Sequence, residues 1–244
     1  MKRVTQLILA SILFISGMTL TSCSDGYSLD NYIVVVGTVV TTDNSSYYIE
    51  EDDGTKLWVA ATMDYYRPQN GKRVIANVTL LSDKKGEFDH YIRVNSISHI
   101  LTKETIQLTE ANQDSIGNDR VKVLDIWYGG GYLNFIFGAN VGGYANHFIN
   151  LVENTLVTPP NDGEVHLEFR HNANEDPEYR AQQFIVSFNI DKFLNEGEGG
   201  VKTFVIKANT FGEGEKEFTI EINPTKTKVD LGNEEIFVAS NEWE

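Results

Sequence analysis

The sequence predicts an all-β protein in which a small barrel is followed by a β-sandwich. Short runs of β-branched and aromatic residues alternate with clusters of Gly, Asn, Asp and Pro along most of the chain. The turn clusters recur about every ten to fifteen residues, and no segment indicates a long helix. This spacing is typical of sandwiches and barrels, in which tight turns join many short strands.

Residues 32–103 predict a five-stranded barrel of the OB type. The five strand-like runs are YIVVVGTVV, YYIEE, TKLWVAAT, RVIANVTLL and DHYIRVNSISHIL, and turn sequences such as DNSS, DDG and RPQNGK separate them. Gly37 lies inside the first run, where a strand of a small barrel has to bulge or bend sharply. The size and the number of strands are those of an OB-type barrel.

Residues 104–119 predict a polar linker, and residues 120–244 predict the β-sandwich. About seven short strand-like runs follow the linker, with DKFLNEG as a single helical turn between two of them. In the run EVHLEFRH, the apolar residues Val165, Leu167 and Phe169 alternate with polar residues. One face of this strand is therefore expected to be buried and the other to be polar.

Residues 1–22 predict a lipoprotein signal peptide, and residues 23–31 predict a tether. A positively charged start precedes an apolar run, which ends in LTSC with the chain's only cysteine, Cys23. The LTSC sequence resembles the lipobox of bacterial lipoproteins, which implies cleavage before Cys23, lipidation of that residue and attachment to a membrane. An ordinary cleaved signal and an uncleaved anchor helix are the alternatives.

The charge and the single cysteine exclude several classes of protein. The formal net charge is −15, and nucleic-acid binding needs Lys and Arg to neutralise phosphates. We therefore expect no nucleic-acid partner. With Cys23 lipidated, no thiol remains for a disulfide, a metal site or a nucleophile, so the exported body has to fold on its apolar core alone.

Several stretches resemble the NigD-like lipoproteins of Bacteroidetes. They are NGKRVIANVTLL in the first half and DIWYGGGYLNFIF, HFINLV and LEFRHNANED in the second. The resemblance covers nearly the whole mature chain and implies an OB-like N-terminal domain and an immunoglobulin-like sandwich. The family takes its name from a bacteriocin-associated gene cluster, which implies an immunity role. The resemblance supplies no catalytic residue.

The sequence predicts no metal site and no cofactor. His166 and Glu168 share one face of a strand, but a zinc site needs three or four ligands, and Arg170 on that face would repel a cation. The sequences DDG at 52–54 and NANED at 172–176 could mimic calcium loops, although neither has the ligand spacing of an EF-hand.

The sequence also predicts no catalytic residue. The chain contains no G-x-S-x-G motif, and its 35 acidic residues make a search for a carboxylate pair uninformative. The GGG sequence at 129–131 lacks the Lys-Ser/Thr and the helix of a phosphate loop. It predicts a turn or bulge instead, because glycine tolerates the positive φ of such turns.

Aromatic residues are the remaining candidates for a binding site. We expect Tyr65 and Tyr66, in a loop, and Trp58, in a strand, to contact a ligand, because OB-type barrels use exposed rings for stacking. The alternative for the two tyrosines is that they simply cap the end of the barrel. The adjacent pair Tyr47–Tyr48 has to face opposite sides of a strand, and we expect Trp127 to fill the sandwich core.

Together these observations predict a non-enzymatic, membrane-anchored binding or accessory protein of the cell envelope, placed on the outer membrane. Its partner is expected to be a protein or a glycan, on either the periplasmic or the surface side. A bacteriocin immunity protein is the first alternative, and it depends on the family resemblance alone. A glycan hydrolase is the second alternative.

Overall fold

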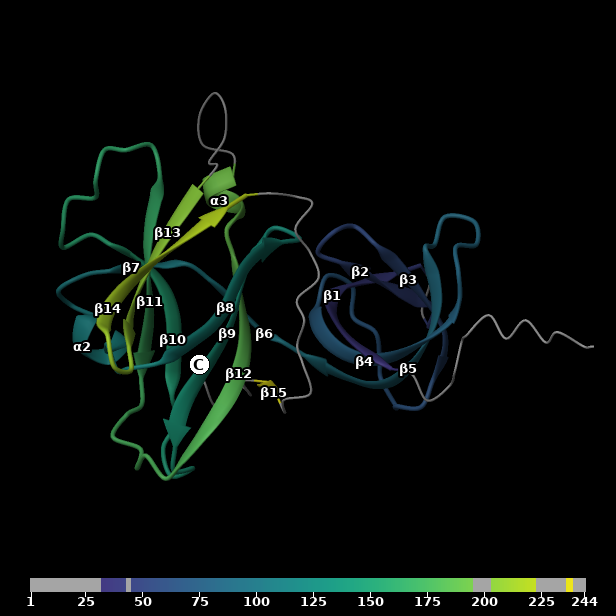
Figure 1. The fold of residues 1–244 in the computed structure, drawn as a ribbon, viewed down its shortest axis with the longest axis horizontal. Coiled ribbons are helices and arrows are strands. Elements are labelled where there is room, and N and C mark those ends of the chain that lie inside the picture. Colours follow the sequence, from purple (N-terminus) through teal and green to yellow (C-terminus); the bar gives the residue numbers. More distant parts are fainter. Residues whose placement is uncertain (1–31, 43–44, 195–202, 223–235, 239–244) are drawn as a thin grey trace, which may run out of the picture.

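The computed structural model describes residues 32–42, 45–194, 203–222 and 236–238. The predicted signal peptide, Cys23 and the predicted tether lie outside these residues. Within the described part, the protein consists of a barrel and a sandwich that lie side by side (Figure 1). No helix in this part is long and apolar enough to cross a bilayer.

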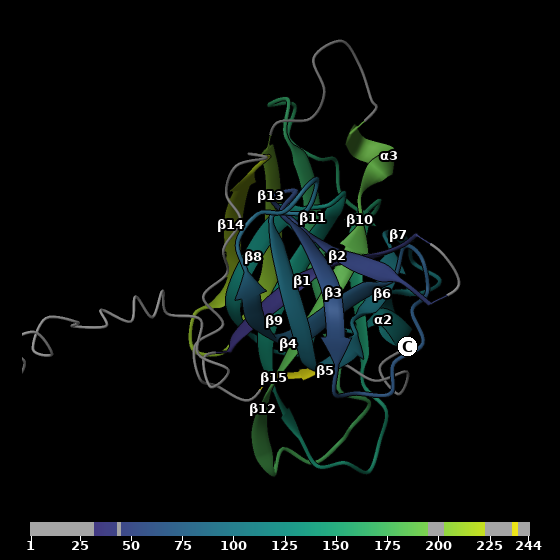
Figure 2. The same ribbon diagram turned by 90° about the vertical axis from the view of Figure 1, so that its right-hand side faces the viewer.

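The N-terminal half is a closed five-stranded barrel, which confirms the prediction. The strands follow one another in the order β1-β2-β3-β5-β4, and Figure 2 shows the barrel in front of the sandwich. Neighbouring strands are antiparallel, except that β3 and β5 are parallel. The bounds are β1 Ile33–Thr41, β2 Tyr47–Glu51, β3 Lys56–Thr62, β4 Arg73–Ser82 and β5 His90–His99.

Strand β1 closes the barrel because it pairs with two neighbours. Gly37 lies where the two ladders overlap, opposite Glu51 of β2 and Val74 of β4. A Cβ atom at Gly37 would lie 2.5 Å from the backbone oxygen of Glu50, so only glycine allows this close approach. Inward-facing apolar side chains fill the barrel, including Val35, Val39, Ile49, Leu57, Val74, Ala76, Val78, Ile92 and Val94.

The C-terminal half is a sandwich of two sheets, also as predicted. One sheet has the order β14-β13-β11-β10-β7. Its strands are β7 Ile106–Leu108, β10 Phe148–Asn154, β11 Val165–Asn172, β13 Thr203–Thr210 and β14 Gly214–Glu221. The other sheet has the order β15-β12-β9-β8, and β6 also pairs with β12. Its strands are β6 Leu101–Glu104, β8 Lys122–Gly129, β9 Tyr132–Val141, β12 Arg180–Asn189 and β15 Ile236–Val238.

The alternation in β11 is the one that the sequence predicts. Leu167 and Phe169 are buried in the sandwich core, where the rings of Phe135 and Phe169 stack with their centroids 4.6 Å apart. On the other face, Glu168 forms ion pairs with Arg170 and Lys207. This face is therefore a row of paired charges and does not form a metal site around Glu168.

Two predicted turns are confirmed. Gly130 and Gly131 have φ values of 60° and 87° between β8 and β9, in the left-handed region that favours glycine. The short helix α3 (Asp191–Leu194) occupies the predicted helical turn.

The segment 104–119 differs from the predicted linker, because it belongs to the sandwich. Its strand β7 pairs in parallel with β10, and its short helix α2 (Gln113–Ile116) follows. Leu108 and Ile116 are buried against Val152 in a small apolar cluster. The polar residues around these two apolar side chains conceal the pattern in the sequence.

A network of buried polar groups joins the barrel to the sandwich. Arg73 of β4 is 1% exposed and binds both carboxylate oxygens of Asp52, at 2.5 and 3.0 Å. The indole Nε1 of Trp127 donates to Asp52 Oδ2 at 2.7 Å, and Arg73 donates to Asn134 Oδ1 at 2.8 Å. The network therefore fixes two barrel residues to two sandwich residues.

The position of Trp127 corrects the expectation that it fills the sandwich core. Trp127 is 6% exposed, but it packs in a separate cluster with Val36 and Ile100 on one side and Ile136 and Ile185 of the sandwich on the other. Its indole N–H requires a polar partner, and Asp52 at the interface supplies one, whereas the phenylalanine-rich core does not.

Candidate functional site

Four aromatic side chains on the outside of the barrel form the strongest candidate for a binding site. Tyr48 of β2 lies opposite Trp58 of β3, and Trp58 lies opposite Tyr91 of β5. Phe88 joins them from the loop between β4 and β5. All four are partly exposed. We refer to these four residues as the barrel aromatic cluster.

Phe88 lies close to each of the other three rings. Its ring centroid is 4.8 Å from that of Trp58, 5.4 Å from that of Tyr48 and 6.3 Å from that of Tyr91. These separations lie in the range in which aromatic pairs attract one another. The loop is therefore packed on the sheet, and the four rings form one surface.

Hydrogen-bonding side chains border the barrel aromatic cluster on β5 and β4. Arg93 lies two residues after Tyr91, so both side chains face outward. Arg93 Nε donates to Asn95 Oδ1 at 3.0 Å, and Asn95 Nδ2 donates to Asn77 Oδ1 at 2.8 Å. Arg93 therefore begins a row of bonded polar side chains that leads away from Tyr91 along the outside of the barrel, and such side chains can also bond to the hydroxyl groups of a ligand.

The structure brings only one of the three predicted ligand residues into this cluster. Trp58 is part of it. Tyr66 packs instead against the inward-facing Tyr47, with tilted rings whose centroids are 5.7 Å apart, and bonds through its hydroxyl to His99 Nε2 at 2.9 Å. Burial raises the pKa of Tyr66 to about 12. Tyr65 is 87% exposed on the same loop, apart from the cluster.

Phe88 and the row of strand partners were missed from the sequence. Phe88 ends the stretch SDKKGEF, which has the composition of a turn, and nothing local indicates that its ring folds back on the sheet. The parallel pairing of β3 with β5 places Trp58 beside Tyr91, 33 positions later in the chain. A parallel pairing over that distance leaves no short-range pattern, so a search for short motifs could not have found the cluster.

A second cluster of titratable groups lies in the sandwich, around Asp176 of the NANED stretch. The backbone N–H groups of residues 142–145 donate to its two carboxylate oxygens at distances between 2.5 and 3.1 Å, and His147 Nε2 lies 3.1 Å from Oδ2. Burial raises the pKa of Asp176, but the backbone hydrogen bonds and His147 outweigh this and hold that pKa far below its ordinary value.

The same cluster contains His171, which lies against His147. His147 Nδ1 is 2.8 Å from His171 Nε2. Burial, followed by the charge of His147, lowers the pKa of His171 to about 4. Both ring nitrogens of His147 contact buried groups, so this histidine is not oriented as a base toward an outside substrate. These buried groups hold the loops around Asp176 in place and do not form a catalytic acid–base pair that faces a substrate.

Both stretches weighed as calcium loops therefore use their buried carboxylates internally. Asp52 of DDG binds Arg73, Trp127 and Asn134, and Asp176 of NANED binds backbone N–H groups and a histidine. Calcium requires carboxylate oxygens that converge on one open point. Neither of these two carboxylates offers such oxygens.

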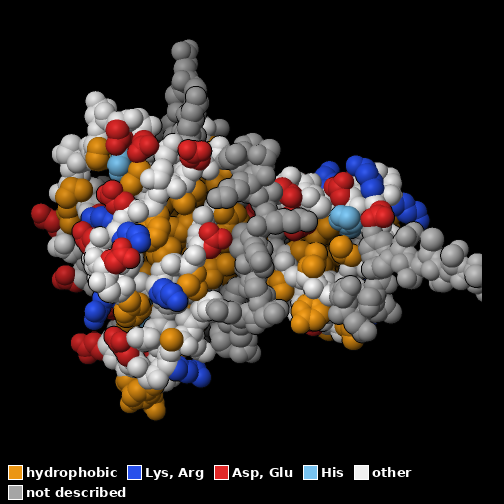
Figure 3. Space-filling model, in the orientation of Figure 1, with side chains coloured by type: hydrophobic (Ala, Val, Ile, Leu, Met, Phe, Trp, Pro, Cys, Tyr) orange, Lys and Arg blue, Asp and Glu red, His pale blue; other side chains and the backbone are white. Residues whose placement is uncertain are grey.

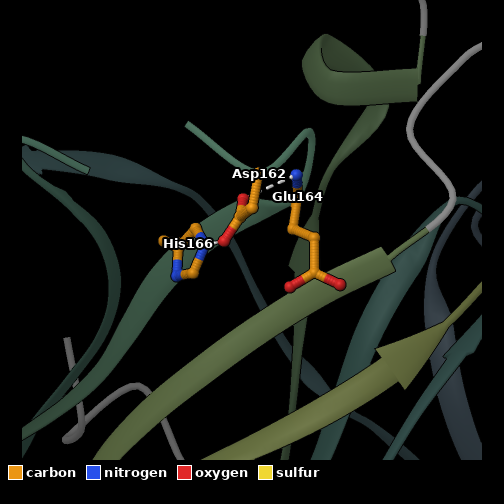
Figure 4. Close-up of side chains that lie close together, drawn as sticks. All are labelled: Asp162, Glu164 and His166. Atoms are coloured by element: carbon orange, nitrogen blue, oxygen red, sulfur yellow. Dashed lines mark hydrogen bonds and ion pairs between the residues drawn. The ribbon is translucent and has the colours of Figure 1, made fainter. Parts of the chain in front are cut away.

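A third group, at the surface, has the residue types of a metal site (Figure 4). Asp162, Glu164 and His166 each have a ligand-type atom within 4.8 Å of the other two. Asp162 already accepts a hydrogen bond from the Glu164 backbone at 3.0 Å and lies 2.9 Å from His166 Nε2. Zinc sites usually have a fourth ligand and an organised second layer of hydrogen bonds, so we assign no metal to this group.

Comparison with known proteins places the chain among proteins of the same two-domain architecture. Residues 36–100 match the NigD-like N-terminal OB domain, and residues 104–222 match the NigD-like C-terminal β-sandwich domain. No curated protein matches the chain.

Three solved structures share the fold over most of their length. A Parabacteroides distasonis protein provisionally described as toxin related is 37% identical over 80% of this chain and 94% of its own, with a TM-score of 0.66. A Bacteroides vulgatus protein of unknown function is 29% identical over 79% and 92%, with a TM-score of 0.71. A NigD-like immunity protein from Bacteroides caccae is 24% identical over 81% and 100%, with a TM-score of 0.61. The two domain matches and these likenesses show that the chain belongs to the NigD-like family.

Proposed function

We propose that the protein is an envelope lipoprotein that binds a glycan on its barrel aromatic cluster and does not act as an enzyme. The observation that carries this proposal is the row Tyr48–Trp58–Tyr91 across three neighbouring strands, completed by Phe88. The family descriptions and the similar structures name no enzymatic activity.

The position of the cluster favours ligand binding. OB barrels bind oligosaccharides and oligonucleotides on the face of their second and third strands, next to the loop between the fourth and fifth strands. Tyr48 and Trp58 lie on that face, and Phe88 lies in that loop. The net charge of −15 disfavours an oligonucleotide, which leaves an oligosaccharide as the ligand that suits both the face and the charge.

The chemistry of the surface also suits a sugar. Neighbouring strands lie about 4.8 Å apart, so a row over three strands extends for about 10 Å, comparable with two linked sugar rings. The apolar faces of sugar rings can stack on the aromatic rings, while Arg93, two residues after Tyr91 on the same face of β5, can bond to their hydroxyl groups. A ligand with both apolar and hydroxylated faces uses both kinds of side chain.

Membrane attachment is the second part of the proposal. Cys23 follows a lipobox-like sequence, and several acyl chains on one residue bind a bilayer firmly, because each buried methylene contributes about 0.8 kcal/mol. A structural relative from Bacteroides fragilis is provisionally described as a lipoprotein, although at 13% identity this likeness concerns the fold alone. Cell fractionation tests the anchor: we expect Cys23→Ala to move the protein from the outer-membrane fraction to the soluble fraction.

Calorimetric titration with a panel of neutral and acidic oligosaccharides tests the binding site. At least one oligosaccharide should bind, and Trp58→Ala should weaken its affinity about tenfold or more, since one stacked ring contributes on the order of 1–3 kcal/mol. Tyr65→Ala is the matched control, because it removes an exposed tyrosine from the same barrel outside the cluster. Failure of every glycan to bind, or equal affinity for wild type and Trp58→Ala, would rule out this site.

A second candidate function is that of an immunity protein that acts beside a toxin. The 37% identical relative that is provisionally described as toxin related favours it. Expression in a bacteriocin-sensitive strain tests this function. Protection that is lost in Cys23→Ala and kept in Trp58→Ala would favour immunity over glycan binding.

A further inference from the structure

A pair of exposed tyrosines occupies one end of the sandwich, separate from the barrel. Tyr144 lies in the loop between β9 and β10 and is 78% exposed, and Tyr179 lies just before β12 and is 72% exposed. Their rings meet edge to face, with centroids 6.0 Å apart. Figure 3 shows hydrophobic side chains gathered at the lower end of the sandwich, where β9 ends and β12 begins in Figure 1. We refer to Tyr144 and Tyr179 as the tip pair.

The two loops that carry the tip pair are held together by one buried carboxylate. Asp176, three residues before Tyr179, accepts the backbone N–H groups of residues 142–145, including that of Tyr144 itself at 2.8 Å. The loops also touch directly, because a Cβ atom on Gly142 would lie 2.5 Å from the backbone oxygen of Pro177. The rings are therefore presented from loops that are ordered before any ligand arrives.

Local backbone strain lies next to the same carboxylate. Asn174 and Glu175 have φ values of 50° and 60°, in the left-handed region that asparagine tolerates and glutamate rarely adopts. Strained residues of this kind persist where the surrounding contacts hold them, and they are concentrated at binding sites. The Asp176 hydrogen bonds order the loops from which the two exposed rings project.

Exposed, preordered tyrosines are typical of surfaces that bind proteins. Tyr supplies a large contact area with only two flexible torsions, and it is enriched among the residues that dominate protein interfaces. A ligand that meets preordered loops loses less conformational entropy on binding. The tip pair therefore has the composition and the rigidity of an interface.

Two clefts lie beside the tip pair: the one that includes Glu178 is mainly acidic, and the one that Tyr144 itself lines includes Arg180. The acidic cleft, of about 410 Å³, has Asp176 in its wall and includes Glu178, the residue directly before Tyr179. Its lining includes one basic residue, Arg120, and four acidic residues, Asp114, Asp119, Glu175 and Glu178, besides Asp176, whose carboxylate is already bonded to backbone N–H groups and His147. Lys and Arg side chains complement such a cleft, and they also bind to the faces of tyrosine rings.

We propose that the tip pair and this acidic cleft bind a protein partner through a segment that presents Lys or Arg side chains. The site lies on the sandwich and is independent of glycan binding on the barrel. The partner contributes cations that lie over the rings of Tyr144 and Tyr179 and pair with the carboxylates of the cleft, such as Glu178. Ionic strength therefore weakens the interaction.

Selection from a random twelve-residue peptide library tests this proposal on the full mature chain. The selection is run against the wild type, with counter-selection against the double variant Tyr144→Ser and Tyr179→Ser. Peptides that bind only the wild type should be enriched in Lys and Arg. Their affinity should fall about tenfold or more in the double variant and remain unchanged in Tyr65→Ser, which removes a still more exposed tyrosine from the barrel.

Two further measurements separate the proposal from a general loss of structure. Glu178→Gln keeps an oxygen for the hydrogen bond from Asn140 but removes a charge from the cleft, so it should weaken the salt dependence of peptide binding. Thermal unfolding should give the same midpoint for the double variant and the wild type. An absence of peptides that depend on the tip pair, or a set of such peptides without basic enrichment, overturns the proposal.

Discussion

The barrel aromatic cluster and the tip pair differ in what holds their rings in place. Tyr48, Trp58 and Tyr91 are fixed by the strand pairing of a closed barrel, and each is partly covered by its neighbours. Tyr144 and Tyr179 are on loops, are more than 70% exposed and depend on the carboxylate of Asp176. The barrel aromatic cluster is therefore positioned by the strands of the fold itself, whereas the tip pair is positioned by loops that the fold does not require.

This difference shows how two surfaces of one small β protein can be ordered by different means. A strand ladder orders a row of rings without any further device, but a loop needs its backbone N–H groups to be satisfied by a specific acceptor. Asp176 is that acceptor in the sandwich. In the same chain, Asp52 uses a buried carboxylate to join the two domains. The fold of the barrel and the loops of the sandwich should accordingly respond differently to mutation and to pH.

The largest expected effect follows from removing the charge of Asp52. The variant Asp52→Asn leaves the guanidinium of Arg73 buried without its counter-ion, and breaking such a pair costs about 3–5 kcal/mol. Urea unfolding should show this loss in the free energy of unfolding. The matched control Glu110→Gln removes an exposed carboxylate and should change little. A loss below about 1 kcal/mol in Asp52→Asn would mean that the buried Arg73 does not depend on Asp52 as its counter-ion.

As the pH falls, the sandwich loops that Asp176 holds should lose stability before the barrel aromatic cluster does. The folded pKa of His171 is about 4, below its ordinary value, so the unfolded chain takes up the proton first as the pH falls from about 6.5 toward 4. Stability is complete above this window and falls within it, by about 3 kcal/mol in all. Asp176, whose pKa is also lowered, extends the loss to still lower pH.

Urea unfolding across this pH range, combined with amide hydrogen exchange, tests the acid effect region by region. Exchange protection should fall first in residues 142–147 and later in β2 and β3. The variant His171→Asn should flatten the stability curve between pH 6.5 and 4, whereas His166→Gln, which changes a surface histidine, should not. Parallel loss of protection in both regions contradicts the view that the loops depend on this cluster.

A smaller effect is expected from Phe88→Ala. The ring of Phe88 contacts three others in the barrel aromatic cluster, and aromatic pairs contribute about 0.5–1.5 kcal/mol each. The variant should lower the free energy of unfolding by about 1–2 kcal/mol and weaken glycan affinity several-fold, because the loop no longer packs on the sheet. Met63→Ala serves as the control, since Met63 is an exposed apolar residue of the same barrel. Unchanged glycan affinity in Phe88→Ala would place the ligand away from this loop.

The sequence predicts the fold well because the patterns that indicate strands and turns extend over only a few residues. The alternation in β11, the glycine turn at 129–131 and the five runs of the barrel are all patterns within a few residues. The role of segment 104–119 and the position of Trp127 depend on partners far along the chain, namely Val152 and Asp52. The composition of a short segment does not reveal which distant residues it will contact.

The candidate site was predictable only in part, for the same reason. Trp58 stands out as a ring in a barrel strand, but the residues that complete its surface are Tyr91, through a parallel ladder, and Phe88, through a loop. Tyr65 and Tyr66 have the composition of a binding loop, yet Tyr66 covers the inward-facing Tyr47. Adjacent positions in the sequence do not reveal which ring faces a ligand.

Fluorine NMR of the protein labelled with 5-fluorotryptophan tests the central claim most directly. The chain has three tryptophans, and the resonance of Trp58 is assigned from its loss in Trp58→Phe. Saturation with the oligosaccharide that binds in calorimetry should shift the Trp58 resonance, while that of Trp127, which is 6% exposed at the domain interface, stays in place. A Trp58 resonance that does not move at saturation would contradict glycan binding on the barrel aromatic cluster.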